Sequence, residues 1–216
     1  MIKAFIMVAA VCSIALALGE EIPRLEATTD ISEEAESFLE QGVGSTRGML
    51  FWNISTSSTL PSKIGRDYGC HNLLDGLPET AWVEGEDSLG LGVTITISAP
   101  SFGDEEPYGS PESSPYELER LLFLNGYQAS PKLWAANARV ESLLLIYNER
   151  VMAYIVLQNT MEPQEVDLTG LIELVGWRVM PMDDGDELTF ELLGAYPGEE
   201  YEDTALSEIA LLGYVF

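Results

Sequence analysis

The residues best suited to chemistry lie between Leu121 and Arg139, where an apolar run leads into a loop rich in aromatic, amide and guanidinium groups. Residues 121–124 form a continuous apolar run, which is typical of a buried strand. The side chains after it supply aromatic rings and the paired hydrogen-bonding groups of amides and a guanidinium. The segment has no nucleophilic residue with an adjacent general base. Such a set is suited to holding a polar ligand, not to breaking a bond. Its members are Asn125, Tyr127, Gln128, Trp134, Asn137 and Arg139.

The composition disfavours several kinds of catalytic site. With one histidine, His71, and two cysteines, Cys12 and Cys70, a zinc site of several histidine or cysteine ligands cannot be built. A serine triad would have to use His71, and no nucleophile elbow accompanies it. The sequence also lacks a phosphate-binding P-loop and a dinucleotide fingerprint. Carboxylate pairs carry no signal, because 36 acidic residues produce close pairs by chance.

Two Asp-Gly turns offer oxygen ligands. Asp75 precedes Gly76, Thr80 and a buried-looking Trp82, and convergence of the Asp75 and Thr80 oxygens with backbone carbonyls suits Ca²⁺. An Asx turn that only directs the chain into the first core strand explains the same residues equally well. The turn at residues 183–187 lacks the spacing of a helix-loop-helix calcium site, so we predict a solvated hairpin loop there.

These candidate groups must be positioned by β-strands. Residues 93–97 alternate apolar and polar side chains, and residues 143–147 and 151–157 flank a turn as a hairpin does. Short strands at close spacing predict an all-β sandwich. The Pro-, Gly- and acid-rich segment 99–115 is predicted to be a surface loop, either a lid or a tolerated insertion. Further strands are predicted at residues 121–124, 171–179, 188–193 and 209–215.

The first 19 residues resemble a secretory signal peptide, with Lys3 before an apolar run that ends in small residues. The run is shorter than the about 20 residues that a membrane span needs, so no integral span is expected in the mature chain. Lipid attachment at Cys12 is the less favoured alternative, because Val11 fits a lipobox poorly. Cleavage after Gly19 leaves Cys70 without an internal disulfide partner. Residues 20–44 are predicted to be an acidic N-terminal spacer with little core of its own, and residues 45–216 the sandwich.

The charge of the chain limits its partners. The 36 acidic and 10 basic side chains give a formal net charge of −26. Nucleic acid and anionic membrane surfaces require clustered Lys and Arg, which this sequence lacks. No nucleic-acid partner is therefore expected.

Several separated motifs, in order, resemble a known family. They are Asn72-Leu-Leu-Asp-Gly, Thr80-Ala-Trp-Val-Glu-Gly, Asn125-Gly-Tyr-Gln with Asn137 and Arg139, Tyr196-Pro-Gly with Tyr201-Glu-Asp-Thr, and Ser207-Glu-Ile. Together they resemble the NADase-type glycan-binding domain, a discoidin-like module found attached to streptococcal NAD glycohydrolase. The similarity spans about Met49 to Gly213 and extends more distantly to galactose-binding-like discoidin domains.

The resemblance implies a jelly-roll β-sandwich with a non-catalytic role. It implies that Asp75 and Thr80 lie near Glu208 and hold a structural Ca²⁺. It further implies that the 125–128, 82–85 and 196–204 loops meet at one end. There, Tyr127, Trp134 and Tyr201 would stack on a sugar, while Glu84, Gln128, Asn137 and Arg139 would bind its hydroxyls; Trp82 and Asn125 could equally serve the core and a turn.

The sequence therefore predicts a secreted or periplasmic carbohydrate-binding module that is not an enzyme. The alternative is a cell-envelope module that binds another protein through the same loop surface. The expected partner is therefore a glycan under the first hypothesis and an envelope protein under the second.

Overall fold

A computed structural model describes residues 21–41, 52–99, 116–177, 180–183 and 185–215. The predicted signal peptide, Cys12 and nearly all of the acidic 99–115 loop lie outside these residues. Within the described part of the chain, no helix is long and apolar enough to cross a membrane.

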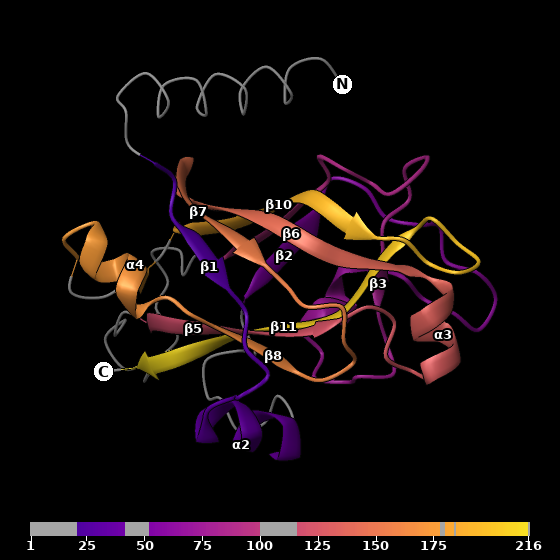
Figure 1. Ribbon diagram of the computed structural model, residues 1–216, viewed down its shortest axis with the longest axis horizontal. Helices are drawn as coiled ribbons and strands as arrows, with labels where there is room; N and C mark the ends of the chain where they lie inside the picture. Colours follow the sequence, from indigo (N-terminus) through magenta and orange to yellow (C-terminus); the bar gives the residue numbers. More distant parts are fainter. Residues whose placement is uncertain (1–20, 42–51, 100–115, 178–179, 184, 216) are drawn as a thin grey trace, which may run out of the picture.

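The fold is a β-sandwich of two layers (Figure 1). One layer has the order β2-β4-β10-β6-β7-β1, and the other contains β3, β11, β5, β8 and β9. The first layer is built from β1 (Arg24–Glu26), β2 (Asn53–Thr56), β4 (Thr94–Ser98), β6 (Ala138–Tyr147), β7 (Arg150–Val156) and β10 (Glu187–Tyr196). The second is built from β3 (Trp82–Val83), β5 (Tyr116–Asn125), β8 (Gln164–Asp167), β9 (Met180–Met182) and β11 (Thr204–Val215).

The core lies between these layers. Phe123 of β5 and Phe190 of β10 meet edge to face, with ring centroids 5.9 Å apart. Apolar side chains at alternate positions of both layers surround this pair and are buried. The predicted strands at residues 93–97, 121–124, 143–147, 151–157, 188–193 and 209–215 all coincide with strands of the sandwich. The apolar patterns thus located these strands correctly.

The two layers join at one end through a short parallel pairing. Thr204 and Ala205 of β11 pair with Ala138 and Arg139 of β6. Farther along, β11 pairs antiparallel with β5 and with β3. Strand β11 therefore connects the layers at the end where the predicted ligand-binding residues lie.

The continuous apolar run in β5 reflects burial on both of its faces. Leu121 and Phe123 point into the sandwich, whereas Leu122 packs outside it, against Phe38. Phe38 belongs to α2 (Glu33–Gln41), which lies beneath the β5–β11 layer in Figure 1. A strand covered on both faces needs apolar residues at successive positions, not only at alternate ones.

The N-terminal segment is more closely integrated than the predicted spacer with little core of its own. Strand β1 pairs in parallel with β7, and Ala35 and Phe38 of α2 are buried. Ser32, just before α2, accepts a hydrogen bond from the Ala35 amide at 3.3 Å. The acidic residues of α2 kept the average hydropathy low and concealed its narrow apolar face.

One predicted strand is wrong. Residues 171–179 do not form a strand: the described part begins with α4 (Thr169–Leu174), followed by a turn at Gly176 with φ +74°. Leu171 and Ile172 are buried on one side of α4. A short apolar run fits a helix and a strand alike. Residues 183–187 connect β9 to β10, and these two strands do not pair in the described part of the chain, so the predicted hairpin there is wrong.

Candidate functional site

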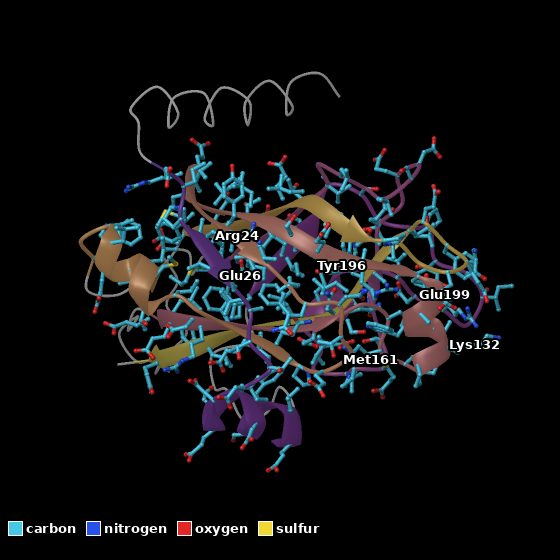
Figure 2. All side chains as sticks on the ribbon, in the orientation of Figure 1. Arg24, Glu26, Lys132, Met161, Tyr196 and Glu199 are labelled. Atoms are coloured by element: carbon cyan, nitrogen blue, oxygen red, sulfur yellow. The ribbon has the colours of Figure 1, made fainter. Side chains whose placement is uncertain are left out.

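Three loops converge at the end of the sandwich where the layers join. The 126–137 loop contains α3 (Pro131–Ala136), and the 197–203 loop packs against it: the Tyr201 amide donates to the Ala136 carbonyl at 2.8 Å. Lys132 on α3 and Glu199 in the 197–203 loop lie at this same end (Figure 2). The 57–69 loop adjoins them, since the rings of Tyr68 and Tyr127 have centroids 6.5 Å apart.

Asn125 anchors the first loop from inside the fold. Its side chain is fully buried and reaches β6 of the other layer, where it donates to the Val140 carbonyl at 2.7 Å and accepts from the Val140 amide at 3.0 Å. Its own carbonyl accepts from the Trp134 indole at 2.9 Å and from the Gln128 amide side chain at 3.1 Å. Asn125 is thus the turn residue considered above, and it fixes the positions of Trp134 and Gln128.

Arg139 is directed inward and binds protein groups. Its guanidinium donates to the Asn137 carbonyl at 2.8 Å, to the Asn159 side-chain oxygen at 2.9 Å and to the Pro197 carbonyl at 3.1 Å. It also lies 4.4 Å from the centroid of the Trp134 ring, in a cation–π contact. Burial lowers the pKa of Arg139. The residue ties the loops to one another, and only 6% of its surface is exposed.

Glu84 and Asn137 are also buried. Glu84 accepts hydrogen bonds from the amides of Glu86 at 2.7 Å and Thr204 at 3.4 Å, and burial raises its pKa. Asn137 donates to the Leu133 carbonyl at 2.8 Å, closing the end of α3. In this structure these side chains hold the backbone of the loop end in shape.

The remaining predicted ligand-binding residues reach the surface. Tyr201 is 50% exposed, and Tyr127, Gln128 and Trp134 are half-buried. Burial raises the pKa of the Tyr127 phenol. The structure therefore brings all seven predicted residues to one end of the sandwich but divides them into three buried groups and four accessible ones.

Sequence reasoning missed three residues at this end: Lys63, Arg66 and Tyr68. Lys63 and Arg66 close a two-residue turn through reciprocal backbone hydrogen bonds of 2.9 Å, and Gly65 supplies the positive φ of +76°. Arg66 lies close enough to the phenols of Tyr68, Tyr127 and Tyr201 for them to raise its pKa, the Tyr68 hydrogen bond most strongly. The sequence did contain a signal for this site: Lys63 and Arg66 are two basic residues that flank Ile-Gly in a strongly acidic chain.

The predicted calcium residues lie next to the loop end. The Thr80 hydroxyl is 2.8 Å and 3.1 Å from the two carboxylate oxygens of Asp75. One oxygen of Glu208, Oε2, accepts from the Gly76 amide at 2.9 Å. Because Gly76 directly follows Asp75, the structure brings Asp75, Thr80 and Glu208 together, as the resemblance implied.

Glu208 is the most perturbed of these groups. It is completely buried, and burial raises its pKa to about 9, with the Asp75 carboxylate adding to the shift. Its Oε1 has no hydrogen-bond partner among the described residues. Those residues contain no cluster of three or more His, Cys, Asp or Glu side chains able to hold a metal. A cation here would need hydroxyl and backbone oxygens besides the two carboxylates, a mixture that Ca²⁺ accepts.

A family model describes most of this chain. Residues 46–212 match the NAD glycohydrolase translocation F5/8 type C domain. The chain belongs to this family. The matched part of the F5/8 type C domain starts beyond β1 and α2, so both elements lie outside the family pattern. No curated protein matches the chain.

Solved structures similar to this F5/8 type C domain include carbohydrate-binding domains of Clostridium perfringens. The CBM32-1 and CBM32-2 domains of ZmpB superpose with a TM-score of 0.54 at 12% identity, covering 90% of this chain and 42% of that one. Their complex with GalNAc gives a TM-score of 0.52 at 12% identity, covering 90% and 41%. The F5/8 type C domain thus spans less than half the length of these neighbours, and the likeness establishes the discoidin-like fold.

Proposed function

We propose that this protein is a non-catalytic carbohydrate-binding module, secreted or periplasmic, which holds a glycan at the loop end of the sandwich. The observation that carries the proposal is the convergence of Tyr127, Gln128 and the half-exposed Tyr201 on that end. Aromatic faces pack against the apolar side of a sugar ring, while amides bind its hydroxyls. The GalNAc complex of the ZmpB domains supports the same class of ligand.

The predicted residues take two roles in this proposal. Tyr127, Gln128, Trp134 and Tyr201 contact the sugar. Glu84, Asn137 and Arg139 position the loops from beneath, because their polar atoms bind protein groups. Substituting a positioning residue would therefore lower the stability and the glycan affinity together, whereas substituting a contact residue would lower the affinity alone.

A glycan array with a matched pair of variants tests the proposal. Tyr201→Ala removes a 50% exposed tyrosine at the loop end, and Tyr214→Ala removes a 53% exposed one near the opposite end of β11. We expect Tyr201→Ala to weaken glycan binding about tenfold or more, while Tyr214→Ala binds as the parent does. Both variants should melt at the parent temperature.

A folded protein that binds no glycan on the array would contradict the proposal. Pull-down from envelope extracts then tests the alternative, a protein partner on the same surface. A stoichiometric partner that is lost with Tyr201→Ala but resists competing sugars would favour the protein-binding function.

We further propose that a structural Ca²⁺ lies between Asp75, Thr80 and Glu208. The unpartnered Glu208 Oε1, buried beside the Asp75 carboxylate, supports a cation at this position. A bound divalent cation would neutralise the two carboxylates and tie the 75–80 turn to β11. It would thereby stabilise the base of the neighbouring loops.

Chelation tests the cation directly. Saturating Ca²⁺ should raise the melting temperature of chelator-treated protein. At a hundredfold excess over Kd, ligand linkage increases the free energy of unfolding by about 3 kcal/mol. Glu208→Gln should abolish the response, whereas Glu79→Gln, on the exposed side of the same turn, should retain it. Identical melting curves with chelator and with Ca²⁺ would refute the site.

A further inference from the structure

Arg66 lies near three tyrosines of the loop end, Tyr68, Tyr127 and Tyr201. Its side chain is exposed, and the 63–66 turn holds its backbone. The phenols of Tyr68, Tyr127 and Tyr201 lie within electrostatic range of it, and the Tyr68 and Tyr127 rings have centroids 6.5 Å apart. Tyr68 is buried and packs with Ala81, Val83 and Ala205. The turn that carries Arg66 therefore adjoins both the buried Tyr68 and the proposed sugar-binding surface.

No carboxylate among the described residues lies within 4.0 Å of Arg66. Among the described residues, ion pairs within 4.0 Å are formed by Arg24, Arg120 and His71, but not by Arg66. Its sequence neighbour Asp67 is turned elsewhere, accepting from the Ser62 hydroxyl at 2.8 Å and the Gly69 amide at 2.9 Å. Lys63, Lys132, Arg139 and Arg150 likewise form no such ion pair among the described residues, so what distinguishes Arg66 is its position beside the loop-end tyrosines.

Lys63 adds a second positive charge on the same turn. Its ammonium lies near Asp203, where it lowers the pKa of a carboxyl that burial raises. Part of its charge is thus balanced by the 197–203 loop. Arg66 forms no ion pair with any residue that the structure describes, and it carries the planar donor fork that matches a carboxylate or sulfate.

We infer that the loop end binds an acidic saccharide, with the anionic group of the sugar on Arg66 and the sugar ring against Tyr127 and Tyr201. The inference rests on the proposed glycan-binding function and specifies its ligand class. The overall charge of −26 repels anions at long range, so an anionic sugar needs a local cation to be held. The tyrosines supply neutral hydroxyl donors and aromatic faces without adding negative charge at neutral pH.

Paired oligosaccharides that differ only in charge test this inference. The probes are lactose with its sialylated and sulfated forms, and oligogalacturonates with their methyl esters. We expect the full-length chain to bind charged members about tenfold or more tightly than their neutral parents, as a charge-assisted contact implies. Raising the salt from 50 to 500 mM NaCl should weaken only the charged members. The sialyl and sulfate arms separate a carboxylate-selective site from a sulfate-selective one.

A pair of charge-matched variants assigns the effect to Arg66. Arg66→Ala should remove the preference for charged sugars, and Arg66→Lys should retain part of it. Arg150→Ala removes the same charge at the start of β7, where Arg150 pairs with Tyr147 at the far end of β6, and should bind as the parent does. Melting curves that coincide with the parent show that the variants are folded.

Two outcomes would overturn the inference in different ways. Equal affinity for charged and neutral partners, or a charge preference that survives in Arg66→Ala, refutes the acidic ligand while leaving glycan binding intact. Absence of binding to every sugar by folded protein refutes the proposed function and the inference together.

Discussion

Glu191 shows how a single residue can act against the stability of this sandwich. It lies on β10, paired with Thr94 and Leu144 on the flanking strands, and is 8% exposed. Its Oε2 has no hydrogen-bond partner among the described residues, and burial raises its pKa. A carboxyl with a raised folded-state pKa favours folding when protonated. The stability that the protonated carboxyl contributes is fully present below its unfolded-state pKa of 4.5 and is lost as the pH rises through its folded-state pKa.

Replacing this carboxyl with a neutral amide should therefore stabilise the protein at high pH. Glu191→Gln is expected to increase the free energy of unfolding at pH 8 by about 1–3 kcal/mol, the range for a buried unsatisfied group. The difference from the parent should shrink towards pH 4. Denaturant unfolding at both pH values measures it, and Glu187→Gln, exposed on the same strand, controls for the lost charge. A difference independent of pH would contradict the assignment.

Arg139 and Arg66 show what residue types can and cannot reveal. The sequence correctly placed Arg139 at the end of the sandwich, but its donors bind carbonyls of residues 134, 137 and 197. Which carbonyls fold back onto a guanidinium depends on loop conformations that local patterns do not encode. Arg66 was missed for the opposite reason: it sits in a short turn whose neighbours, Tyr127 and Tyr201, are distant in sequence.

At the scale of elements, the 126–137 loop depends on close packing at Gly126. This residue has a φ of +82°, and an added Cβ would lie 2.6 Å from Trp134 Cδ1 and 2.8 Å from Arg139 Cγ. The loop can therefore approach the stacked Trp134–Arg139 pair only with glycine at this position.

Gly126→Ala is expected to destabilise the protein by about 1–3 kcal/mol, because it combines backbone strain with a steric overlap. It should also weaken glycan binding, since Tyr127 follows directly. Gly170→Ala makes a suitable control, because nothing lies within 4 Å of a Cβ added there. Thermal melts and array binding measure the two effects, and a Gly126→Ala variant as stable as the control would show that the loop adapts.

The strands were more predictable than the short helices. Alternating side chains predicted the strand at residues 93–97, and the strand predicted at residues 188–193 lies within β10; both observed strands have one face in the core. Residues 169–174 form a helix because Leu171 and Ile172 face the core through helical geometry. Such a short segment has too few residues to display its periodicity, so tertiary packing decides its conformation.

At the scale of the whole molecule, the N-terminal segment and the sandwich form one packed unit. Phe38 of α2 packs with Leu122, Ala210 and Leu212 on the outer face of the β5–β11 layer. Polar contacts strengthen the attachment: Ser32 donates to Glu165 at 2.6 Å, and Glu34 accepts from the Gly213 amide at 3.2 Å.

Phe38→Ala should consequently lower the stability of the entire protein and not only of α2. We expect a loss of about 3–5 kcal/mol, as for other buried phenylalanines. Glu36→Ala, exposed on the same helix, should change the stability little. Urea unfolding followed by tryptophan fluorescence and far-UV circular dichroism measures both. Separate transitions for α2 and the sandwich would contradict a single cooperative unit.

The position of β1 and α2 has a consequence for self-association. Strand β1 is only three residues long and covers the hydrogen-bonding edge of β7, while α2 covers the apolar outer face of β5 and β11. A fragment limited to the family pattern, residues 46–212, would lose both elements. It would expose an unpaired strand edge on one layer and an apolar patch on the outer face of the other, and both features favour aggregation of β-proteins. The segment before the family boundary thus protects the sandwich from its own copies.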